Sequence, residues 1–307
     1  DLHKALHSFP TRRSSDLLVL IAWIIGSMAW HGSLTDDVAF FAFMDRVLMP
    51  FVLFMTAPLF FSTPHRRDLL LRTLSIIGVY LGITAVFEML QASLVFPRYI
   101  MNPSIGLQFG RARGPFIASE ALGTSSAICA FAGALLAARN KGMWRLLGGS
   151  ACGLGLLATG LCLTRSTWIG AVVGLLVGAW LVPRTRRTLA LAGAGLAGVT
   201  ATVLLSVPAA MEKVSARFNA AEPVNDRLGS TDAAIALLQD LPFTGIGWRK
   251  FYPDGAEWFR QSEMYPTNRV VIELHNVILS RAAELGIPAA LLFIAIIIAG
   301  PMLIARR

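Results

Sequence analysis

The sequence predicts an all-α protein, a polytopic transmembrane helical bundle, from two observations. Of its 307 residues, 55% are hydrophobic and 15% are charged, and the mean hydropathy is +0.62. A soluble domain has about 25% charged residues. The apolar residues also fall into runs of roughly 16 to 29 residues, the length that a helix needs to cross a bilayer. Because lipid offers no hydrogen bonds to the backbone, each run is expected to be a helix.

About eight spans are predicted, seven before one long polar segment and one after it. In order, they cover Leu17–Trp30, Val38–Phe61, Leu69–Val95, Phe116–Ala138, Leu146–Leu163, Trp168–Val182, Leu189–Val207 and Asn276–Ile304. Asp45 and Arg46 near the start of the second span place the beginning of its apolar part at Val47. Residues 17–207 therefore hold seven helices, residues 208–275 form a long loop, and residues 276–307 hold the last helix.

The first residues do not share this pattern. Residues 1–16 read DLHKALHSFPTRRSSD, which is neither a signal peptide nor a span. The stretch FPTRRSSDL looks like translated sequencing-adapter sequence, so this segment is excluded from the fold as non-native. We expect the natural start to lie elsewhere.

Lysine and arginine in the short loops predict the orientation of the bundle. Four basic loops fall on one side, at residues 65–67, 139–145, 184–187 and 306–307. Short loops rich in Lys and Arg face the cytoplasm, so these four loops are expected on the cytoplasmic side of the membrane. The loop of residues 208–275 then lies on the outer side.

That long loop is expected to hold short helices. Leu228–Leu241 has apolar residues at helical spacing, with Ser230 or Thr231 as N-cap, and Pro242 ends the helix. Glycines at 245 and 247 predict a turn, and many aromatic residues follow. The loop is either a flap at the membrane interface or a lid over a carbohydrate or lipid headgroup.

Several classes of function are excluded or disfavoured. The net charge of +9 does not indicate nucleic-acid binding, because the positive residues lie in short loops between apolar spans. Cys129, Cys152 and Cys162 lie inside predicted spans and are expected to be small buried apolar residues. On the outer side His31 and His275 are the only histidines, and no cluster has metal-ligand spacing, so neither a metal nor a cofactor is expected.

Arginines on the outer side run against the usual charge bias. Arg111 and Arg113 precede a span, Arg165 lies in a tight turn between two spans, and Arg227 lies in the long loop. A guanidinium presents a rigid fork that matches phosphate oxygens. These arginines either anchor the chain to lipid headgroups or surround a diphosphate.

The end of the long loop carries further polar residues. His275 meets the last span, where it is either a general base or a solvated interfacial histidine. Arg281 and Glu284 are spaced to pair on one helix. Glu88 and Glu120 are similar charged residues in predicted spans.

In their order and spacing, these segments resemble the O-antigen ligase and polymerase family over residues 105–290. Four motifs carry the resemblance: residues 111–116 with Leu122-Gly123, Thr164-Arg165-Ser166, Arg227 followed by PFTGIG at 242–247, and His275-Asn276 with Leu279, Glu284 and Gly286. Two positions depart from the family pattern, Thr231 where an aromatic residue is common and Ala289 where glycine is common. Members of the family usually have ten or more spans, so further spans are expected at both ends.

The resemblance implies a metal-independent glycosyltransferase that moves a glycan from a polyprenyl-diphosphate carrier to an acceptor hydroxyl on the periplasmic face. The acceptor would be lipid A-core for a ligase or the growing glycan for a polymerase. The diphosphate would be held by Arg165, Arg227, Arg111 and Arg113. His275 would be the base, with Asn276 and Glu284 in support. The substrates and the surrounding membrane lipids are the expected partners, with no nucleic acid.

Two other classes of function remain as alternatives. A polysaccharide or lipid exporter would show internal repeats, broken helices and midplane charges. In a non-catalytic subunit of a glycan-assembly complex, His275 and Arg165 would be dispensable. A cavity joining Arg165, Arg227 and His275 would favour the transferase.

Overall fold

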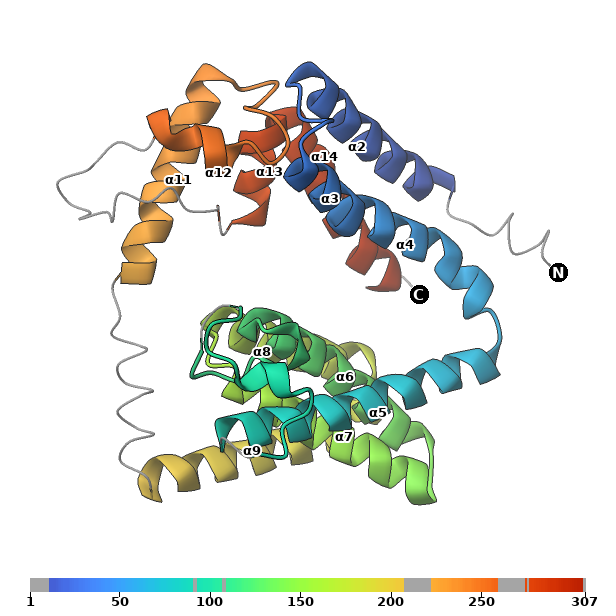
Figure 1. Ribbon diagram of the computed structural model, residues 1–307. Helices are drawn as coiled ribbons and strands as arrows, with labels where there is room; N and C mark the ends of the chain where they lie inside the picture. Colours follow the sequence, from blue (N-terminus) through green and yellow to red (C-terminus); the bar gives the residue numbers. More distant parts are fainter. Residues whose placement is uncertain are drawn as a thin grey trace. The chain divides into compact units, whose positions relative to one another are not determined.

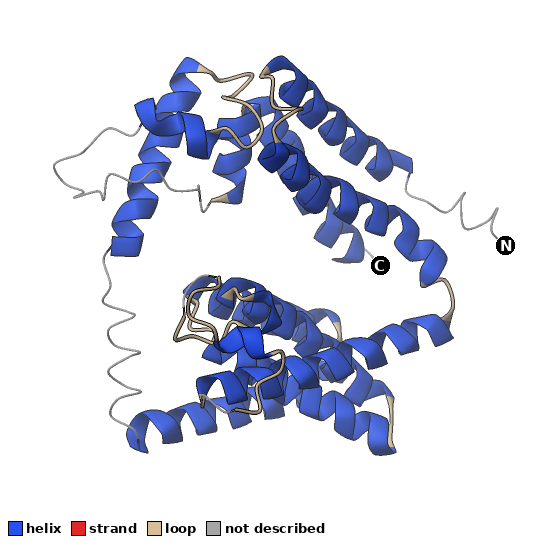
Figure 2. Ribbon diagram, viewed as in Figure 1, coloured by secondary structure: helices blue, strands red, loops and turns tan. Residues whose placement is uncertain are grey.

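A computed structural model of the chain confirms the all-α membrane class (Figures 1 and 2). It describes residues 11–90, 93–106, 109–206, 222–258, 274 and 276–305, and in these ranges every regular element is helical. Three of the described helices are long and apolar enough to cross a membrane, or four if one bent pair is a single span. The count of eight spans stays a prediction. The chain divides into two units, residues 1–60 with 214–307 and residues 61–213, and each has its own apolar cores.

The unit of residues 61–213 contains five long helices that match five predicted spans. They are α5 (Pro64–Met89), α6 (Ser119–Arg139), α7 (Gly142–Leu161), α8 (Arg165–Leu181) and α9 (Arg186–Ser206). Helices α6 and α7 pack closely because Gly133 and Gly148 have no Cβ at their contact. A Cβ on Gly133 would lie only 2.6 Å from the Gly148 carbonyl oxygen, and a Cβ on Gly148 would lie equally close to that of Gly133. Residues 165–181 and 183–195 form the bent pair, at 117°. The three cysteines are free and buried, as predicted.

The other unit begins with two apolar segments. Helix α2 (Thr11–Trp30) comes first. It is followed by one continuous candidate span, which consists of α3 (Asp37–Phe43), a π-helical turn (Met44–Leu48) and α4 (Met49–Phe60). Asp36 caps α3 by accepting a hydrogen bond from the Val38 amide at 2.9 Å. The unit continues with α11 (Glu222–Asp240), α12 (Phe251–Asp254), α13 (Val277–Leu285) and α14 (Ile287–Ala305), and α14 packs against α2.

Helix α11 begins earlier than the sequence pattern predicted. Ser230 and Thr231 are inside the helix, and their hydroxyls donate to the Arg227 carbonyl oxygen at 3.1 and 2.7 Å. The N-cap prediction was therefore wrong. The start at Glu222 with a proline as the second residue is a usual helix beginning. The end of the helix before Pro242 is as predicted.

The last predicted span is two helices. Gly286, with φ +86°, separates α13 from α14, so the prediction of one helix over Asn276–Ile304 was wrong. The Ile287 amide donates to the Pro242 carbonyl oxygen at 2.8 Å. The break is thus stabilised by the segment that follows α11.

Candidate functional site

The segment of residues 242–248 is bonded to the carboxyl end of α13. The Ile246 amide donates to the Ala283 carbonyl oxygen at 2.9 Å, and the Gly247 amide donates to that of Glu284 at 2.9 Å. These bonds satisfy carbonyls that the end of a helix leaves without partners. The loop and the last helices are therefore joined at this point.

Two glycines make this close approach possible. Gly245 has φ +62°, and a Cβ there would lie 2.6 Å from the Ala283 carbonyl oxygen. A Cβ on Gly286 would overlap the Phe243 carbonyl oxygen. The PFTGIG sequence and the glycine two residues after Glu284 are therefore two halves of one packed joint.

Trp248 and an ion pair complete the joint. Trp248 is fully buried, and its indole Nε1 donates to the Ala39 carbonyl oxygen at 3.0 Å. The Arg281 guanidinium lies 4.5 Å from the centre of the Trp248 ring and pairs with the buried Glu284 carboxylate at 3.0 Å. The predicted pairing of Arg281 with Glu284 is confirmed, and Glu284 has a structural partner.

His31 lies beside the same segment, in the turn after α2. A Cβ on Gly247 would lie 2.9 Å from the His31 Cβ, so the two residues are in contact. Burial, and then the charge of Lys250, lower the pKa of His31 below its ordinary value of 6.5. The folded protein therefore favours the neutral imidazole.

Asn276 is the N-cap of α13, a role that the sequence analysis did not assign. Its side-chain oxygen accepts from the amides of Ile278 and Leu279 at 3.1 and 3.2 Å. The cap fixes where α13 begins. His275 lies outside the described residues, so its expected role as a base is not tested.

Three arginines line a small pocket that sequence reasoning missed. Arg46 comes from the π-helical turn, Arg249 from the turn after Trp248, and Arg281 from α13. The pocket has a volume of about 110 Å³ and is also lined by Tyr252 and Glu284 among others. The charge of Arg46 inside a predicted span was a signal in the sequence, since charges in spans are costly and functional. Arg281 gave the same signal, because it lies inside the last predicted span, whereas Arg249 gave none.

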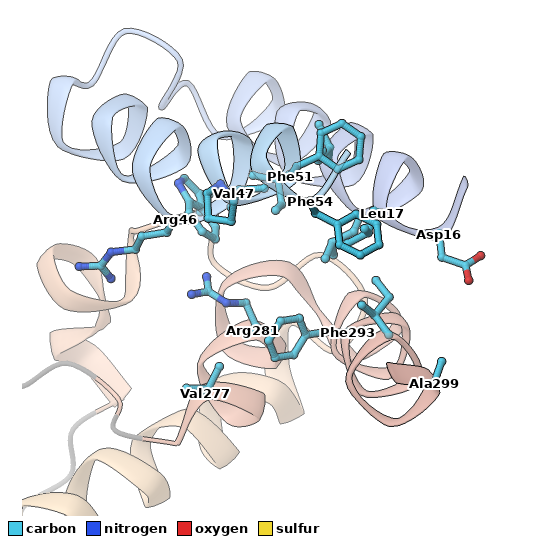
Figure 3. Close-up of a pocket in the computed structure, with 16 residues that line it drawn as sticks. Asp16, Leu17, Arg46, Val47, Phe51, Phe54, Val277, Arg281, Phe293 and Ala299 are labelled. Carbon is cyan, nitrogen blue, oxygen red and sulfur yellow. The ribbon is translucent and has the colours of Figure 1, made fainter. Parts of the chain in front are cut away.

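An apolar cleft of about 480 Å³ lies next to this pocket and shares Arg46, Val277 and Arg281 with it. In Figure 3 the guanidinium groups of Arg46 and Arg281 lie toward one end, and Phe51, Phe54 and Phe293 lie toward the other. The cleft is therefore cationic at one end and mainly apolar along its length, with the Asp16 carboxylate at the far end.

Arg113, in the unit of residues 61–213, has a structural role. The guanidinium is buried and donates to the carbonyl oxygens of Ile100 and Ile105, each at 2.7 Å. The Glu88 carboxylate accepts from the Arg113 and Gly114 amides, both at 2.8 Å, and lies 3.5 Å from Arg113 Nε. Because the fork of Arg113 is used within the protein, Arg113 is not included among the phosphate ligands proposed below, and the expectation that it binds diphosphate stays an untested prediction.

Arg111 and Arg165 come from segments that the same unit holds together. The Ala112 amide donates to the Leu161 carbonyl oxygen at 3.2 Å, which ties the Arg111 segment to the end of α7. Arg165 is the first residue of α8, a few residues further along the chain, and both arginines are half-buried. A hydrogen bond of 3.0 Å between Ser119 and Thr164 hydroxyls fixes the turn before Arg165.

The remaining predicted residue, Arg227, lies in α11 and is exposed. Arg227 belongs to the unit of residues 1–60 and 214–307, whereas Arg165 belongs to the unit of residues 61–213. Within the described ranges, no group of three His, Cys, Asp or Glu side chains is arranged to hold a metal ion.

The helices and their apolar lengths define the class, an all-α membrane protein. A family model described as O-antigen ligase matches residues 150–294. The match confirms the resemblance to the O-antigen ligase family and supports a membrane glycan transferase of that kind. Arg165, Arg227, His275, Asn276 and Glu284 lie within the matched residues, whereas Arg111 and Arg113 lie before them. No curated protein gives a significant sequence match to the chain.

Proposed function

We propose that this protein transfers a glycan from a polyprenyl-diphosphate carrier to an acceptor hydroxyl on the periplasmic face of the bacterial inner membrane. Besides the family match, one observation carries the proposal. The bond between Ala112 and Leu161 holds the Arg111 segment beside the turn that leads to Arg165. Two guanidinium groups on joined, half-buried segments suit the two phosphates of such a carrier.

In the proposed reaction, the acceptor hydroxyl gives its proton to His275 and its oxygen bonds to the anomeric carbon of the donor. The bond from that carbon to the diphosphate oxygen breaks, and the diphosphate leaves on its polyprenyl chain. Arg111 and Arg165, with Arg227 from the loop, stabilise the developing negative charge. His275 supplies general-base catalysis, and holding both substrates together supplies much of the remaining acceleration.

The other proposed residues act through position. Asn276 caps α13 directly after His275 and so fixes the start of that helix. Glu284 holds Arg281, and its carbonyl oxygen accepts from Gly247. Since arginines supply the charge stabilisation, we propose that the reaction needs neither a metal nor a cofactor.

The proposed face of the membrane has its own test. Reporter fusions after Lys141 and Gly255 are expected to report opposite sides, with Lys141 in the cytoplasm and Gly255 in the periplasm. Both reporters on one side would contradict the topology.

Transfer by the purified full chain tests the reaction, with a polyprenyl-diphosphate glycan and separate lipid A-core and glycan acceptors. His275→Ala is expected to lower the rate about 10²–10⁴-fold while the protein remains folded and binds donor. Arg165→Lys keeps the charge but loses the fork, so it should also impair transfer, whereas the exposed Arg145→Lys should not. The acceptor that is used decides between ligase and polymerase.

Two results would contradict the mechanism. Near-normal turnover by His275→Ala would exclude the base role, and loss of turnover in EDTA would exclude the metal-free reaction. Full activity of Arg165→Lys would indicate anchoring to headgroups instead.

The break at Gly286 bears on the exporter alternative, because transporters use broken helices to bind their substrates. In this protein the amide after the break donates to Pro242, and Phe243 packs against Gly286. The groups at the break are thus partnered by the protein's own loop. This favours a structural role for the break, in which it holds the loop in place, and disfavours a transport pathway through the membrane.

A further inference from the structure

Three like charges meet in the small pocket of the unit of residues 1–60 and 214–307. Arg46 and Arg249 are both close enough to Arg281 to repel it electrostatically. Among the described residues that line the pocket, Glu284 carries the one negative charge, and it pairs with Arg281 at 3.0 Å. Three cations against one anion raise the free energy of the unliganded pocket, and a bound anion would lower it.

The backbone is irregular at two of these arginines. Arg46 lies in a π-helical turn within the continuous candidate span Asp37–Phe60. Arg249 has φ +61°, a conformation that glycine adopts more easily than arginine. Such turns and strained residues concentrate at functional sites. Both irregular segments carry an arginine that lines the same pocket.

The adjacent cleft indicates what kind of anion would bind. Its walls are mainly apolar side chains of α2, α4 and α14, including Leu20, Ile24, Phe51, Phe293 and Ile296. Its volume of about 480 Å³ lies within the range of ordinary ligand sites. Because the cleft and the arginine pocket share Arg46 and Arg281, one ligand with an anionic head and a hydrocarbon chain would fill both (Figure 3).

We infer that the chain binds a phosphorylated lipid here, with its phosphate between Arg46, Arg249 and Arg281 and its hydrocarbon chain in the cleft. Guanidinium groups bind phosphate oxygens through paired, charge-assisted hydrogen bonds. The site shares no residue with the diphosphate site proposed at Arg111 and Arg165. The inference is about binding and does not depend on the transfer reaction.

The test measures binding to the purified full chain in dodecylmaltoside micelles by native mass spectrometry. The probes are dioleoyl phosphatidic acid, dioleoylglycerol and inorganic phosphate. Phosphatidic acid is expected to bind at least about tenfold more tightly than either of the others, because only it has both head and chains. Arg46→Gln and Arg281→Gln are each expected to weaken the binding of phosphatidic acid about tenfold or more, which is the effect of losing one charged hydrogen bond.

Two further variants provide a charge control and a test of where the hydrocarbon chain binds. Lys250→Gln removes a neighbouring positive charge that pairs with Asp254 and does not line the pocket, so it is expected to leave phosphatidic acid binding unchanged. Ala299→Trp places a large side chain in the cleft. This variant is expected to weaken the binding of phosphatidic acid about tenfold and to leave the binding of inorganic phosphate unchanged.

Three results would overturn the inference. Equal affinity for phosphatidic acid in Arg46→Gln and the unchanged protein would exclude the arginine pocket. Arg46 is exposed, so this variant remains informative if Arg281→Gln does not fold. Unchanged phosphatidic acid binding in Ala299→Trp would indicate a site for free phosphate only. Equal binding of dioleoylglycerol and phosphatidic acid would indicate a purely apolar site.

Discussion

Replacing Glu88 by glutamine tests whether Arg113 is a structural arginine. The carboxylate accepts two backbone amides at 2.8 Å and provides a negative charge beside a fully buried guanidinium. Glutamine retains one oxygen for the amides but removes the charge. Breaking a buried ion pair from one side costs about 3–5 kcal/mol. In a unit of this size each kcal/mol lowers Tm by about 2–4 °C, so a decrease of roughly 6–20 °C is expected.

Thermal unfolding of the purified protein, followed by intrinsic fluorescence, measures this decrease. The control is Asp68→Asn in the same helix, because Asp68 pairs with Arg72 at a partly exposed position where a pair contributes about 0–1 kcal/mol. A double-mutant cycle with Arg113→Met should give a coupling energy above about 1 kcal/mol. If Glu88→Gln unfolds at the same temperature as Asp68→Asn, the structural account of Arg113 is refuted. Loss of transfer in Arg113→Met at unchanged Tm would restore its phosphate-binding role.

Substitutions at four further positions probe the joint between residues 242–248 and α13. Gly245→Ala and Gly286→Ala should each lower the free energy of unfolding by more than about 2 kcal/mol, because a positive φ and close backbone contact oppose a Cβ. The control is Gly149→Ala, which has open space around the added Cβ and should be neutral or stabilising in the same unfolding scans. Asn276→Ala should lose about 0.5–2 kcal/mol as a helix cap is removed, and Asn276→Asp should retain most of it; equal Tm values for the two would contradict the cap. The pKa of His31 is lowered in the folded state, so the unfolded state binds more protons near pH 6.5. The stability that neutral His31 contributes is therefore complete above pH 6.5 and is lost as the pH falls toward the folded-state pKa. His31→Gln should flatten the dependence of Tm on pH below 6.5, and an unchanged slope would assign it to other groups.

The sequence predicted the helices well because apolar run length is a direct consequence of membrane thickness. The starts and ends of α6 to α9 lie within four residues of the predicted spans, whereas α5 begins five residues and ends six residues earlier than predicted. The break at Gly286 was missed because glycine is common within spans, where it allows close packing. Only the structure shows that Gly286 instead meets Phe243 from a distant segment.

The candidate site was predicted less completely, because an arginine in a sequence does not reveal what its guanidinium faces. Arg111 and Arg113 are two residues apart, yet Arg113 bonds to carbonyl oxygens inside the protein. Glu88 within a predicted span was a sign of a buried partner. The pocket of Arg46, Arg249 and Arg281 brings together three distant segments, which no local pattern can predict.

The motifs that resemble O-antigen ligases therefore divide into two physical kinds. Gly245, Gly286 and Glu284 hold the loop segment against α13, so substitutions there act first on the folded structure. Arg111 and Arg165 are half-buried on segments fixed by backbone and hydroxyl bonds, and a change in their guanidinium groups leaves those bonds in place. Loss of activity in a glycine variant would consequently say little about chemistry. The same loss in Arg165→Lys at unchanged Tm would point to the bound diphosphate itself.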